Sequence, residues 1–319
     1  MLQRLKENKY IHPILAKYHH VKIVALILLI IILISFSFQH YTSHSSSHSK
    51  KTHYVFTFWE PARAMPGYIR LCIKTWAKNL PSDYEIVLLD YSNIARYIGL
   101  DLVSKIICKD MSLPKQADAV RVAVLSRYGG IWMDADTVLM NSSFFDLFAG
   151  HELAIFGNPR RHQHNVGFIY ASQKSRIIQA WLSTIIYNVK VYRFFGLLSK
   201  IFPIPYVQMQ WKRVHSWNYL GNGIFDRLSL SASEKEYLCI DRASMFAFPE
   251  HTLMMGSSEE QYQHFYFQNG TLDEVYSKCR GILLLHNSWT PREYKSMSEK
   301  EFLKQDIRLA RIIGDILRR

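Results

Sequence analysis

Two carboxylates one residue apart, Asp134 and Asp136, end an apolar run that a glycine pair, Gly129 and Gly130, opens. In a β-strand, residues i and i+2 point to the same face, so both acids project together if the run IWMDAD is a strand. Two like charges held side by side are costly unless a cation lies between them, and hard divalent cations prefer oxygen ligands. The spacing predicts a metal site; the alternative is a solvated pair of turn-forming aspartates.

A predicted helix, LPKQADAVRVAVLSRY, precedes the glycine pair and brings another acid and a base close to these carboxylates. Asp118 and Arg121 are three residues apart and therefore share one face of this helix. One interpretation is a structural ion pair. The other is a binding site for a sugar, whose hydroxyl groups need both hydrogen-bond acceptors and donors.

The whole phrase QADAVRVAVLSRYGGIWMDAD is similar to the sugar-binding D-x-D region of glycosyltransferase family 32. That group includes Golgi α-mannosyltransferases, glycolipid α-galactosyltransferases and capsular polysaccharide synthesis proteins. The resemblance extends from about Tyr54 to Trp289. The residues that match its central motif are Asp118, Arg121, Gly129, Gly130, Trp132, Asp134 and Asp136.

The resemblance implies a GT-A type nucleotide-sugar transferase fold, an α/β architecture with a mixed, mainly parallel sheet flanked by helices. The implied reaction is a metal-dependent, retaining transfer of a hexose from a UDP- or GDP-linked sugar to a glycan, glycolipid or polysaccharide acceptor. The implied cofactor is Mn²⁺ or Mg²⁺, with Asp136, Asp134 and His286 as candidate ligands.

The same resemblance assigns candidate roles in substrate binding and catalysis. Trp59 would stack on the nucleotide base, Asp90 would lie by the base or ribose, and Asn165 by the donor sugar. The catalytic set is Asp134, Asp136, Asp118 and Arg121, of which the last two also bind substrate together with Trp132, Ser288 and Trp289. No catalytic base is assigned, because the acceptor hydroxyl is expected to attack from the leaving-group face and pass its proton to a phosphate oxygen.

Two other classes of protein fit part of the pattern. In haloacid-dehalogenase-like phosphatases, a strand ends in a motif like MDADTV, which would make Asp134 a nucleophile and Asp136 a general acid. Those enzymes need a second acidic cluster, and the only Gly-Asp pair here, Gly314 and Asp315, lies close to the C-terminus. The third class is a non-catalytic, carbohydrate-binding membrane protein.

The elements that must position these residues alternate between strand and helix patterns. Strands are predicted at 52–59, 85–90, 131–136, 153–157, 166–171 and 281–289, and helices at 67–80, 92–99, 101–108, 113–128 and 175–189. Alternation of this kind predicts an α/β sheet with ligands at the strand ends. The aromatic and basic segment 190–217 shows no clear periodicity and is expected to close over a substrate, lie on a membrane or pack in the core.

The ends of the chain suggest a membrane anchor and a terminal helix. Residues 23–40 form the predicted anchor; extended to Val21 and Tyr41, the apolar run could span ~30 Å as a helix, and it follows a basic segment, 1–22. A signal peptide is the alternative, but no small-residue cleavage site follows the apolar run. The positive-inside rule then places the N-terminus in the cytoplasm. A polar stem at 41–51 would lead to a catalytic domain at 52–297 and an amphipathic helix at 298–319, which starts with a capping box of Ser298 and Glu301.

The predicted location follows from this topology. A eukaryotic owner would hold the domain in the Golgi or ER lumen, whereas a bacterial owner would hold the protein at the inner membrane. The net charge of +13 favours anionic partners, but no nucleic-acid-binding motif is present, so a nucleic-acid partner is not expected. Of the four cysteines, Cys239 and Cys279 are the predicted disulfide pair, and four buried thiols are the alternative.

Overall fold

The computed structural model describes residues 53–158, 163–202, 204–233, 236–241, 259–279 and 281–319. All of them belong to one compact unit, Lys51–Arg319. The predicted cytoplasmic segment, anchor and stem lie outside the described residues. Within the described ranges, no helix has the length and apolar character needed to cross a membrane.

A six-stranded sheet forms the centre of the unit, in the order β2-β1-β3-β6-β5-β7. Its strands are β1 (His53–Phe58), β2 (Tyr84–Leu89), β3 (Gly130–Met133), β5 (Leu153–Asn158), β6 (Gln163–Ala171) and β7 (Leu238–Asp241). The pairs β1–β2, β1–β3 and β5–β7 are parallel, and β6 runs antiparallel to both β3 and β5. The predicted mixed, mainly parallel sheet is therefore confirmed.

A second, two-stranded sheet joins the middle of the chain to its late part. In it, β4 (Thr137–Leu139) pairs antiparallel with β8 (Ile282–Leu284). The strand predicted at 281–289 is shorter than expected and is followed by the 3-10 helix η5 (Asn287–Trp289). This pairing carries the residues after β8 to the turn that contains Asp134 and Asp136.

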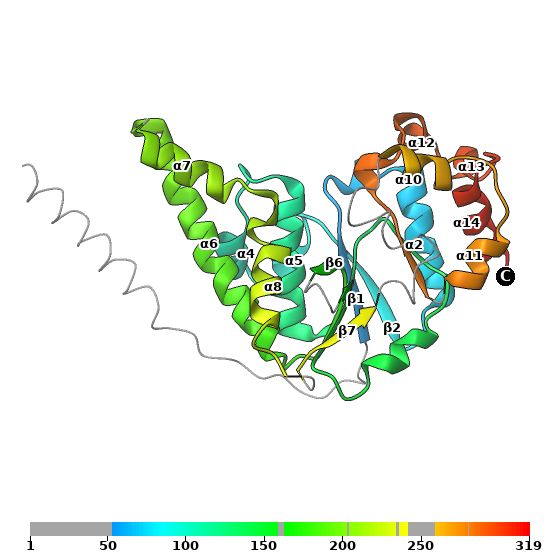
Figure 1. The fold of residues 1–319 in the computed structure, drawn as a ribbon, viewed down its shortest axis with the longest axis horizontal. Helices are drawn as coiled ribbons and strands as arrows, with labels where there is room; N and C mark the ends of the chain where they lie inside the picture. The colour runs from blue at the N-terminus through cyan, green and yellow to red at the C-terminus, as the bar shows by residue number, and fades with distance from the viewer. Residues whose placement is uncertain (1–52, 159–162, 203, 234–235, 242–258, 280) are drawn as a thin grey trace, which may run out of the picture. The chain divides into compact units, whose positions relative to one another are not determined.

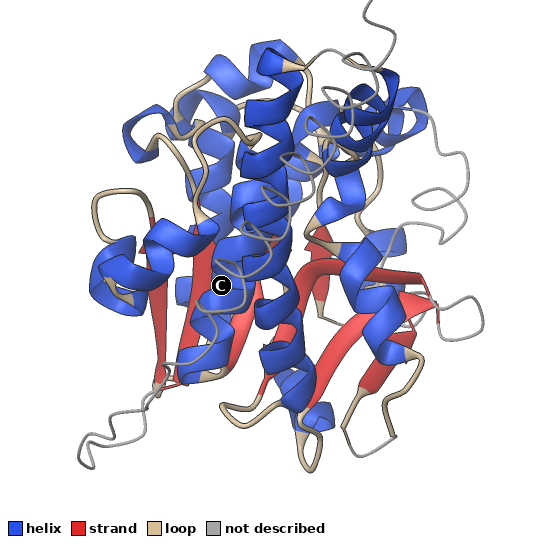
Figure 2. Cartoon of the chain, turned by 90° about the vertical axis from the view of Figure 1, so that its left-hand side faces the viewer, coloured by secondary structure: helices blue, strands red, loops and turns tan. Residues whose placement is uncertain are grey.

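Helices cover both faces of the large sheet, as the two views show (Figures 1 and 2). One group contains α3 (Ile94–Ile98), α4 (Leu100–Ile106), α5 (Leu113–Tyr128), α6 (Arg176–Ile201), α7 (Pro205–Val214) and α8 (Asn222–Ser229). The other contains α2 (Gly67–Asn79), α10 (Glu259–Tyr266), α11 (Asp273–Lys278), α12 (Arg292–Ser296), α13 (Glu299–Phe302) and α14 (Arg308–Arg318). Short 3-10 turns complete the fold as η1 (Ala62–Ala64), η2 (Ser143–Phe148) and η3 (Trp217–Tyr219).

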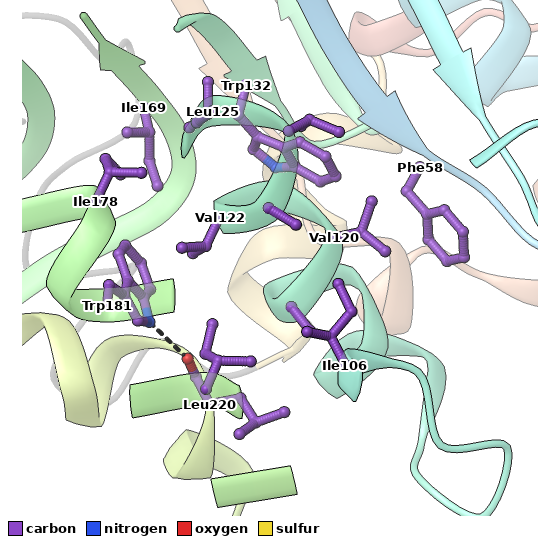
Figure 3. Close-up of a cluster of buried hydrophobic side chains, with 14 of the residues drawn as sticks. Phe58, Ile106, Val120, Val122, Leu125, Trp132, Ile169, Ile178, Trp181 and Leu220 are labelled. Carbon is purple, nitrogen blue, oxygen red and sulfur yellow. Dashed lines mark hydrogen bonds between the residues drawn. The ribbon is translucent and has the colours of Figure 1, made fainter. Parts of the chain in front are cut away.

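Helix α5 is the central helix of the first group and is buried on all sides from Ala119 to Leu125, a stretch that is apolar except for Arg121. Val120, Val122 and Leu125 are completely buried, and in Figure 3 Val122 lies toward Trp181 of α6 while Val120 lies toward Phe58 and Ile106. The indole nitrogen of Trp181 donates a hydrogen bond of 2.8 Å to the carbonyl oxygen of Leu220 in the same cluster. Each fully buried aliphatic side chain contributes about 1.5–3 kcal/mol, so α5 holds Asp118 and Arg121 on a rigid support.

The C-terminal segment differs from its prediction. The capping box of Ser298 and Glu301 is confirmed, but the single helix over 298–319 is wrong, because α13 ends at Phe302 and α14 begins at Arg308. Ile307 is extended (φ −123°, ψ 151°). Phe302 and Ile307 are both buried in the cluster formed with α2, whereas Leu303 is exposed. Burying Phe302 and Ile307 together requires the break that a continuous helix would not provide.

Two more expectations need correction. The helix predicted at 175–189 continues to Ile201, and the segment without clear periodicity forms the end of α6, helix α7 and η3. The predicted disulfide between Cys239 and Cys279 does not form, since none of the four cysteines is joined to another. Cys72 and Cys279 are buried, whereas the other two cysteines are partly buried. The alternative of four buried thiols therefore holds for two of the four.

Candidate functional site

A pocket of about 620 Å³ lies at the ends of β1 and β3 and at the start of α5. Most of the residues that the sequence singled out line it, namely Trp59, Asp118, Arg121, Asp134, Asp136, Asn165, His286 and Ser288. Asp90, Trp132 and Trp289 do not. The pocket therefore gathers side chains from segments that are far apart in the sequence.

The two aspartates occupy a turn and not a strand. β3 ends at Met133, the backbone nitrogen of Asp134 donates to the carbonyl oxygen of Gly167 at 2.8 Å, and that of Thr137 donates to the carbonyl oxygen of Asp134 at 3.0 Å. The argument from strand alternation is thus wrong, although both carboxylates do line one pocket. A side chain at Gly167 would meet Asp134, because a Cβ atom there would lie 3.0 Å from Asp134 Oδ2.

Asp134 is held by two donors from buried side chains. Arg121 Nη2 and Trp132 Nε1 lie 3.0 Å and 2.8 Å from its Oδ1 atom. The guanidinium of Arg121 also lies over the indole of Trp132, at 5.2 Å from the ring centroid. Trp132 is only 1% exposed, so its place in the structure suits positioning Asp134 and not contacting a substrate.

Asp136 is held from the opposite side by the loop after β8. The backbone nitrogen of Asn287 donates to Asp136 Oδ2 at 2.8 Å, and that of Leu285 donates to the Asp136 carbonyl oxygen at 3.1 Å. The Tyr68 hydroxyl in turn donates to Asn287 Oδ1 at 2.5 Å. Burial, and next the charge of Asp134, raise the pKa of Asp136 to about 7, against the lowering effect of the Asn287 hydrogen bond. The charged form of this carboxylate therefore needs a positive partner.

Asp118 and Arg121 form a buried pair on α5 that is only partly satisfied. Arg121 Nη1 lies 3.3 Å from Asp118 Oδ1, yet Nη1 and Nε of this arginine have no hydrogen-bond partner within the described part of the chain. Arg121 is 3% exposed and borders the pocket. Burial raises the pKa of Asp118 to about 6 against the opposing effect of Arg121. Buried donors without partners are rare and costly, so they are a natural place for ligand oxygens.

Helix α8 starts against the Asp118 carboxylate. Gly221 precedes the helix, and a Cβ atom at this position would lie 2.6 Å from Asp118 Oδ2. The positive end of the helix dipole is thus close to a negative charge, which favours the ionised carboxylate. The glycine is required by this close approach.

The loop after β8 presents His286 and Ser288 to the pocket. Ser288 Oγ lies 2.8 Å from His286 Nδ1, and the backbone nitrogen of His286 donates to the Tyr262 hydroxyl at 3.0 Å. Trp289 does not line the pocket; its ring stacks on that of His286, with the centroids 4.1 Å apart. Partial burial lowers the pKa of His286, which favours the neutral imidazole. Trp289 thus orients the histidine.

Trp59 and Asn165 line the pocket, while Asp90 serves a local turn. Asp90 Oδ1 accepts hydrogen bonds from the backbone nitrogens of Ser92 and Asn93, at 2.8 Å and 3.1 Å, just before α3. Asp90 does not border the pocket. Asp is a frequent turn former for this reason, and this arrangement gives no support to a role with the base or ribose.

Sequence reasoning missed several polar and aromatic residues of the pocket. They are Glu60, Trp217, Asn218, Asn222 and Asn287. Three of them belong to the run WNYLGN, whose clustered Asn and Gly residues are a turn signal. This run lies beside Asp118 in the fold because Gly221 packs against the Asp118 carboxylate. No local sequence pattern reveals that contact.

The carboxylate oxygens of the pocket are ligands that suit a hard divalent cation shared with a substrate. In the described ranges, no group of three or more His, Cys, Asp and Glu side chains is arranged to hold a metal, so His286 does not complete a three-residue site with Asp134 and Asp136. Mg²⁺, however, is commonly bound through one or two carboxylates together with substrate phosphates. Asp136 forms no ion pair with a basic side chain among the described residues and feels Arg121 only weakly against its burial and the charge of Asp134, so it suits that arrangement.

Comparisons with known proteins assign the chain to a family. The family model described as capsular polysaccharide synthesis protein matches residues 31–274. The chain belongs to this family, which confirms the resemblance noted in the sequence. A search of curated proteins found no match.

One solved structure is similar to the chain at a low level. It is the crystal structure of the glycosyltransferase GlyE in Streptococcus pneumoniae TIGR4, with 14% sequence identity and a TM-score of 0.39. The alignment covers 84% of this chain and 61% of the GlyE chain. The chain thus spans less than two thirds of the length of that protein.

Proposed function

We propose that the chain is a metal-dependent, retaining glycosyltransferase of GT-A type that moves a hexose from a nucleoside-diphosphate sugar to a glycan, glycolipid or polysaccharide acceptor. The observation that carries this proposal is the pairing, in one pocket, of a carboxylate that needs a cation, Asp136, with a buried guanidinium that has unused donors, Arg121. A diphosphate with its cation and a sugar with its hydroxyls would satisfy these two features together.

The donor would lie across the pocket from Trp59 to Arg121. Trp59 follows β1 and offers an aromatic face at the pocket wall, which suits a nucleotide base. Asp118 and Arg121 would bind hydroxyls of the hexose, and Asn165 borders the same region. The free donors of Arg121 would then gain acceptors that the protein itself does not supply.

Asp136, with Asp134 beside it, would hold Mn²⁺ or Mg²⁺ against the diphosphate, and His286 and Ser288 would approach from the facing loop. When bound, such a cation neutralises the negative charge that grows on the departing nucleoside diphosphate. The protein's part is to hold the carboxylates in place, Asp134 through Arg121 and Trp132 and Asp136 through Asn287.

The acceptor hydroxyl would attack on the face from which the diphosphate leaves, so that the configuration at the anomeric carbon is retained. Its proton would pass to a phosphate oxygen of the leaving group. The proposal therefore assigns no protein side chain as catalytic base, and the pocket residues act by binding, orienting and charge stabilisation.

The phosphatase alternative finds little support in the geometry. A nucleophilic carboxylate must present an oxygen to its substrate; Arg121 and Trp132 engage only Oδ1 of Asp134, so this residue does not distinguish the two classes and the second acid has to do so. Asp315, the acid of the only Gly-Asp pair, lies on α14, where it accepts hydrogen bonds from Tyr276 and Arg318, and it does not line the pocket. A purely sugar-binding function remains the second candidate, since it would use the same Asp118 and Arg121 pair.

The location of the protein is part of the proposal. The apolar run at 23–40 with its preceding basic residues supports a single-pass anchor with a cytoplasmic N-terminus. We propose a Golgi or ER lumenal domain in a eukaryotic cell, and an inner-membrane protein in a bacterium.

The proposal is tested with the full chain in detergent, assayed for release of nucleoside diphosphate from a panel of UDP- and GDP-sugars with Mn²⁺. One donor is expected to be cleaved, with activity lost in EDTA and reduced at least about 100-fold by Asp136→Asn. Asp101→Asn, an exposed acid on α4, is the matched control and should retain activity. Turnover that survives both EDTA and Asp136→Asn would refute the metal-dependent transferase, and tight sugar binding without turnover would favour the binding protein.

A further inference from the structure

The turn between α6 and α7 exposes an unusual number of large apolar side chains. We call this region the hairpin tip and define it as the exposed apolar residues Phe194, Leu197, Ile201, Phe202, Ile204, Tyr206 and Met209, which are 41–61% exposed. Contiguous apolar patches on soluble proteins usually mark an interaction surface. The hairpin tip therefore calls for a partner that is itself apolar in part.

The exposed residues of α6 lie on one face of the helix. Phe194, Leu197 and Ile201 are separated by three, four and seven residues, the spacing of a single helical stripe. The stripe faces away from the core, because Tyr192 and Val189 on the other face are buried. The apolar surface is thus a regular feature of a long helix and not a frayed end.

The hairpin is firmly packed on its inner side. A Cβ atom at Gly196 of α6 would lie 3.1 Å from the Trp211 ring of α7, so the glycine lets the two helices approach closely. The Trp211 ring in turn lies 5.0 Å from that of Tyr192, and Val207 is buried. The structure therefore presents the tip on a rigid support.

The charged side chains of α6 and α7 themselves are all basic. No Asp or Glu occurs in the sequence between Glu152 and Asp226. The two helices carry the basic residues Arg176, Lys190, Arg193, Lys200, Lys212 and Arg213. Arg176 pairs with Glu236 at the far end of α6, and Arg193 donates to the carbonyl oxygens of Ser104 and Ile107, so the positive charge offered to a partner comes mainly from Lys200, Lys212 and Arg213. An apolar stripe flanked by Lys and Arg without acids is the composition of helices that lie in the headgroup region of anionic membranes.

The hairpin is connected directly to the pocket. Helix α7 leads into η3, whose Trp217 and Asn218 line the pocket, and Trp217 is 69% exposed. Figure 1 shows α7 and the end of α6 at the upper left of the view and α12, which follows the pocket loop 286–288, at the upper right. A surface that meets the hairpin tip would therefore lie near the entrance of the pocket.

We infer that the hairpin tip docks on an anionic membrane surface, with its apolar side chains among the lipid headgroups and its basic side chains on the phosphates. A second copy of the chain is a poorer occupant, because it would bring the same positive charge to the contact. The apolar run at 23–40 is also a poorer one, because it offers no negative charge to the basic residues. The identity of the acceptor rests on the proposed transferase activity: the membrane would present the acceptor as a lipid-linked glycan.

The docking is tested by fluorescence quenching of the full chain reconstituted with vesicles of phosphatidylcholine and brominated phosphatidylglycerol. Tyr206→Trp places the probe at the tip, and Leu147→Trp places it at an exposed apolar site of η2 as the matched control. With the signal of the unsubstituted protein subtracted, we expect strong quenching for Tyr206→Trp and little for Leu147→Trp. Equal quenching of the two probes would overturn the inference.

Two further results would also overturn it. One is quenching of Tyr206→Trp that is unchanged when brominated phosphatidylcholine replaces the anionic lipid, since charge would then play no part. The other is a dimer in detergent that Ile201→Glu with Ile204→Glu dissociates, since a second copy would then cover the tip. Loss of quenching in the same double variant would support the docking.

An activity measurement separates this inference from the proposed function. Ile201→Glu with Ile204→Glu is expected to lower transfer to a vesicle-borne acceptor at least tenfold while donor hydrolysis in detergent stays unchanged, and Leu100→Glu with Leu147→Glu should leave both unchanged. Absence of donor hydrolysis in the unsubstituted protein would count against the transferase alone, because the quenching measurement does not depend on turnover. Unaltered transfer by the Ile201→Glu, Ile204→Glu variant would overturn the role of docking in acceptor delivery.

Discussion

Asp134 shows how a single side chain depends on neighbours that never touch a substrate. Its Oδ1 atom receives both Trp132 Nε1 and Arg121 Nη2, and the indole of Trp132 also lies under the guanidinium. A hydrogen bond to a charged group contributes about 1.5–3 kcal/mol. Trp132 is therefore a positioning residue, although the sequence grouped it with those that bind substrate.

Trp132→Phe removes the indole hydrogen bond to the Asp134 carboxylate. A loss of about 1.5–3 kcal/mol, at about 1.4 kcal/mol per factor of ten, should lower kcat/KM for the sugar donor by about 10–100-fold. Trp181→Phe is the matched control, because Trp181 is equally buried and also donates one indole hydrogen bond, to Leu220 outside the pocket. Both variants should lose comparable stability in urea unfolding, but only the first should lose activity. Equal loss of activity in the two would mean that Trp132 acts through general packing.

At this scale the sequence predicted the residues of the contiguous motif well and the scattered ones less well. Asp118, Arg121, Asp134 and Asp136 lie in one short phrase, and all line the pocket. Asp90 lies outside the pocket and caps a turn, and a turn-capping aspartate and a ligand-binding one at a strand end look alike in sequence. Trp217 was missed because only tertiary packing brings it to the pocket.

Among the elements, those with a strong local signal were predicted and those set by burial were not. Strands β1 and β2 and helices α2 and α5 lie within a residue or two of their predicted bounds. The strand β3 ends early because the chain turns between Asp134 and Thr137, where the Thr137 nitrogen donates to the Asp134 carbonyl oxygen, and then enters β4. The C-terminal helix breaks because Phe302 and Ile307 are both buried against α2, a requirement that the helical periodicity of 298–319 does not reveal.

The docking of α13 on α2 makes acid stability depend on Glu299. Burial opposes ionisation of this carboxyl, but hydrogen bonds and charges from Lys74 and Arg70 outweigh it and lower its pKa. A carboxyl with a lowered pKa in the folded state adds stability above its ordinary pKa, and this contribution is lost as the pH falls through the folded-state value. Because all three side chains are partly exposed, the contribution is about 1 kcal/mol or less.

Glu299→Gln should therefore lower the free energy of unfolding at pH 7, and the difference from the unsubstituted protein should shrink as the pH falls through the lowered pKa of the glutamate. Urea unfolding of both proteins from pH 7 to pH 3 measures the difference, and Glu293→Gln, an exposed acid of the neighbouring α12, is the control. High salt should reduce the difference at pH 7. A deficit that stays constant from pH 7 to pH 3 would show that α13 is held by packing and not by this ion pair.

On the scale of the whole unit, the pocket is the place where the sequence's distant segments meet. Its walls come from the end of β1, the start of α5, the Asp134 turn, the 217–222 segment and the loop after β8. A ligand that contacts several of these segments binds only the folded chain, and such a ligand stabilises it by about 2.7 kcal/mol at 100 times its dissociation constant. For a unit of this size, that corresponds to a rise in Tm of several degrees.

Mn²⁺ and the nucleoside diphosphate of the preferred donor are therefore expected to raise Tm together by more than the sum of their separate effects. The reason is that Asp136 and the diphosphate would share one cation, so each partner completes the coordination that the other begins. Differential scanning fluorimetry of the full chain in detergent measures the four combinations of metal and nucleotide. Asp136→Asn should abolish the excess while Asp101→Asn, on the exposed face of α4, should retain it. Strictly additive shifts in the unsubstituted protein would show that metal and nucleotide bind independently, and the shared site built on Asp136 would then be wrong.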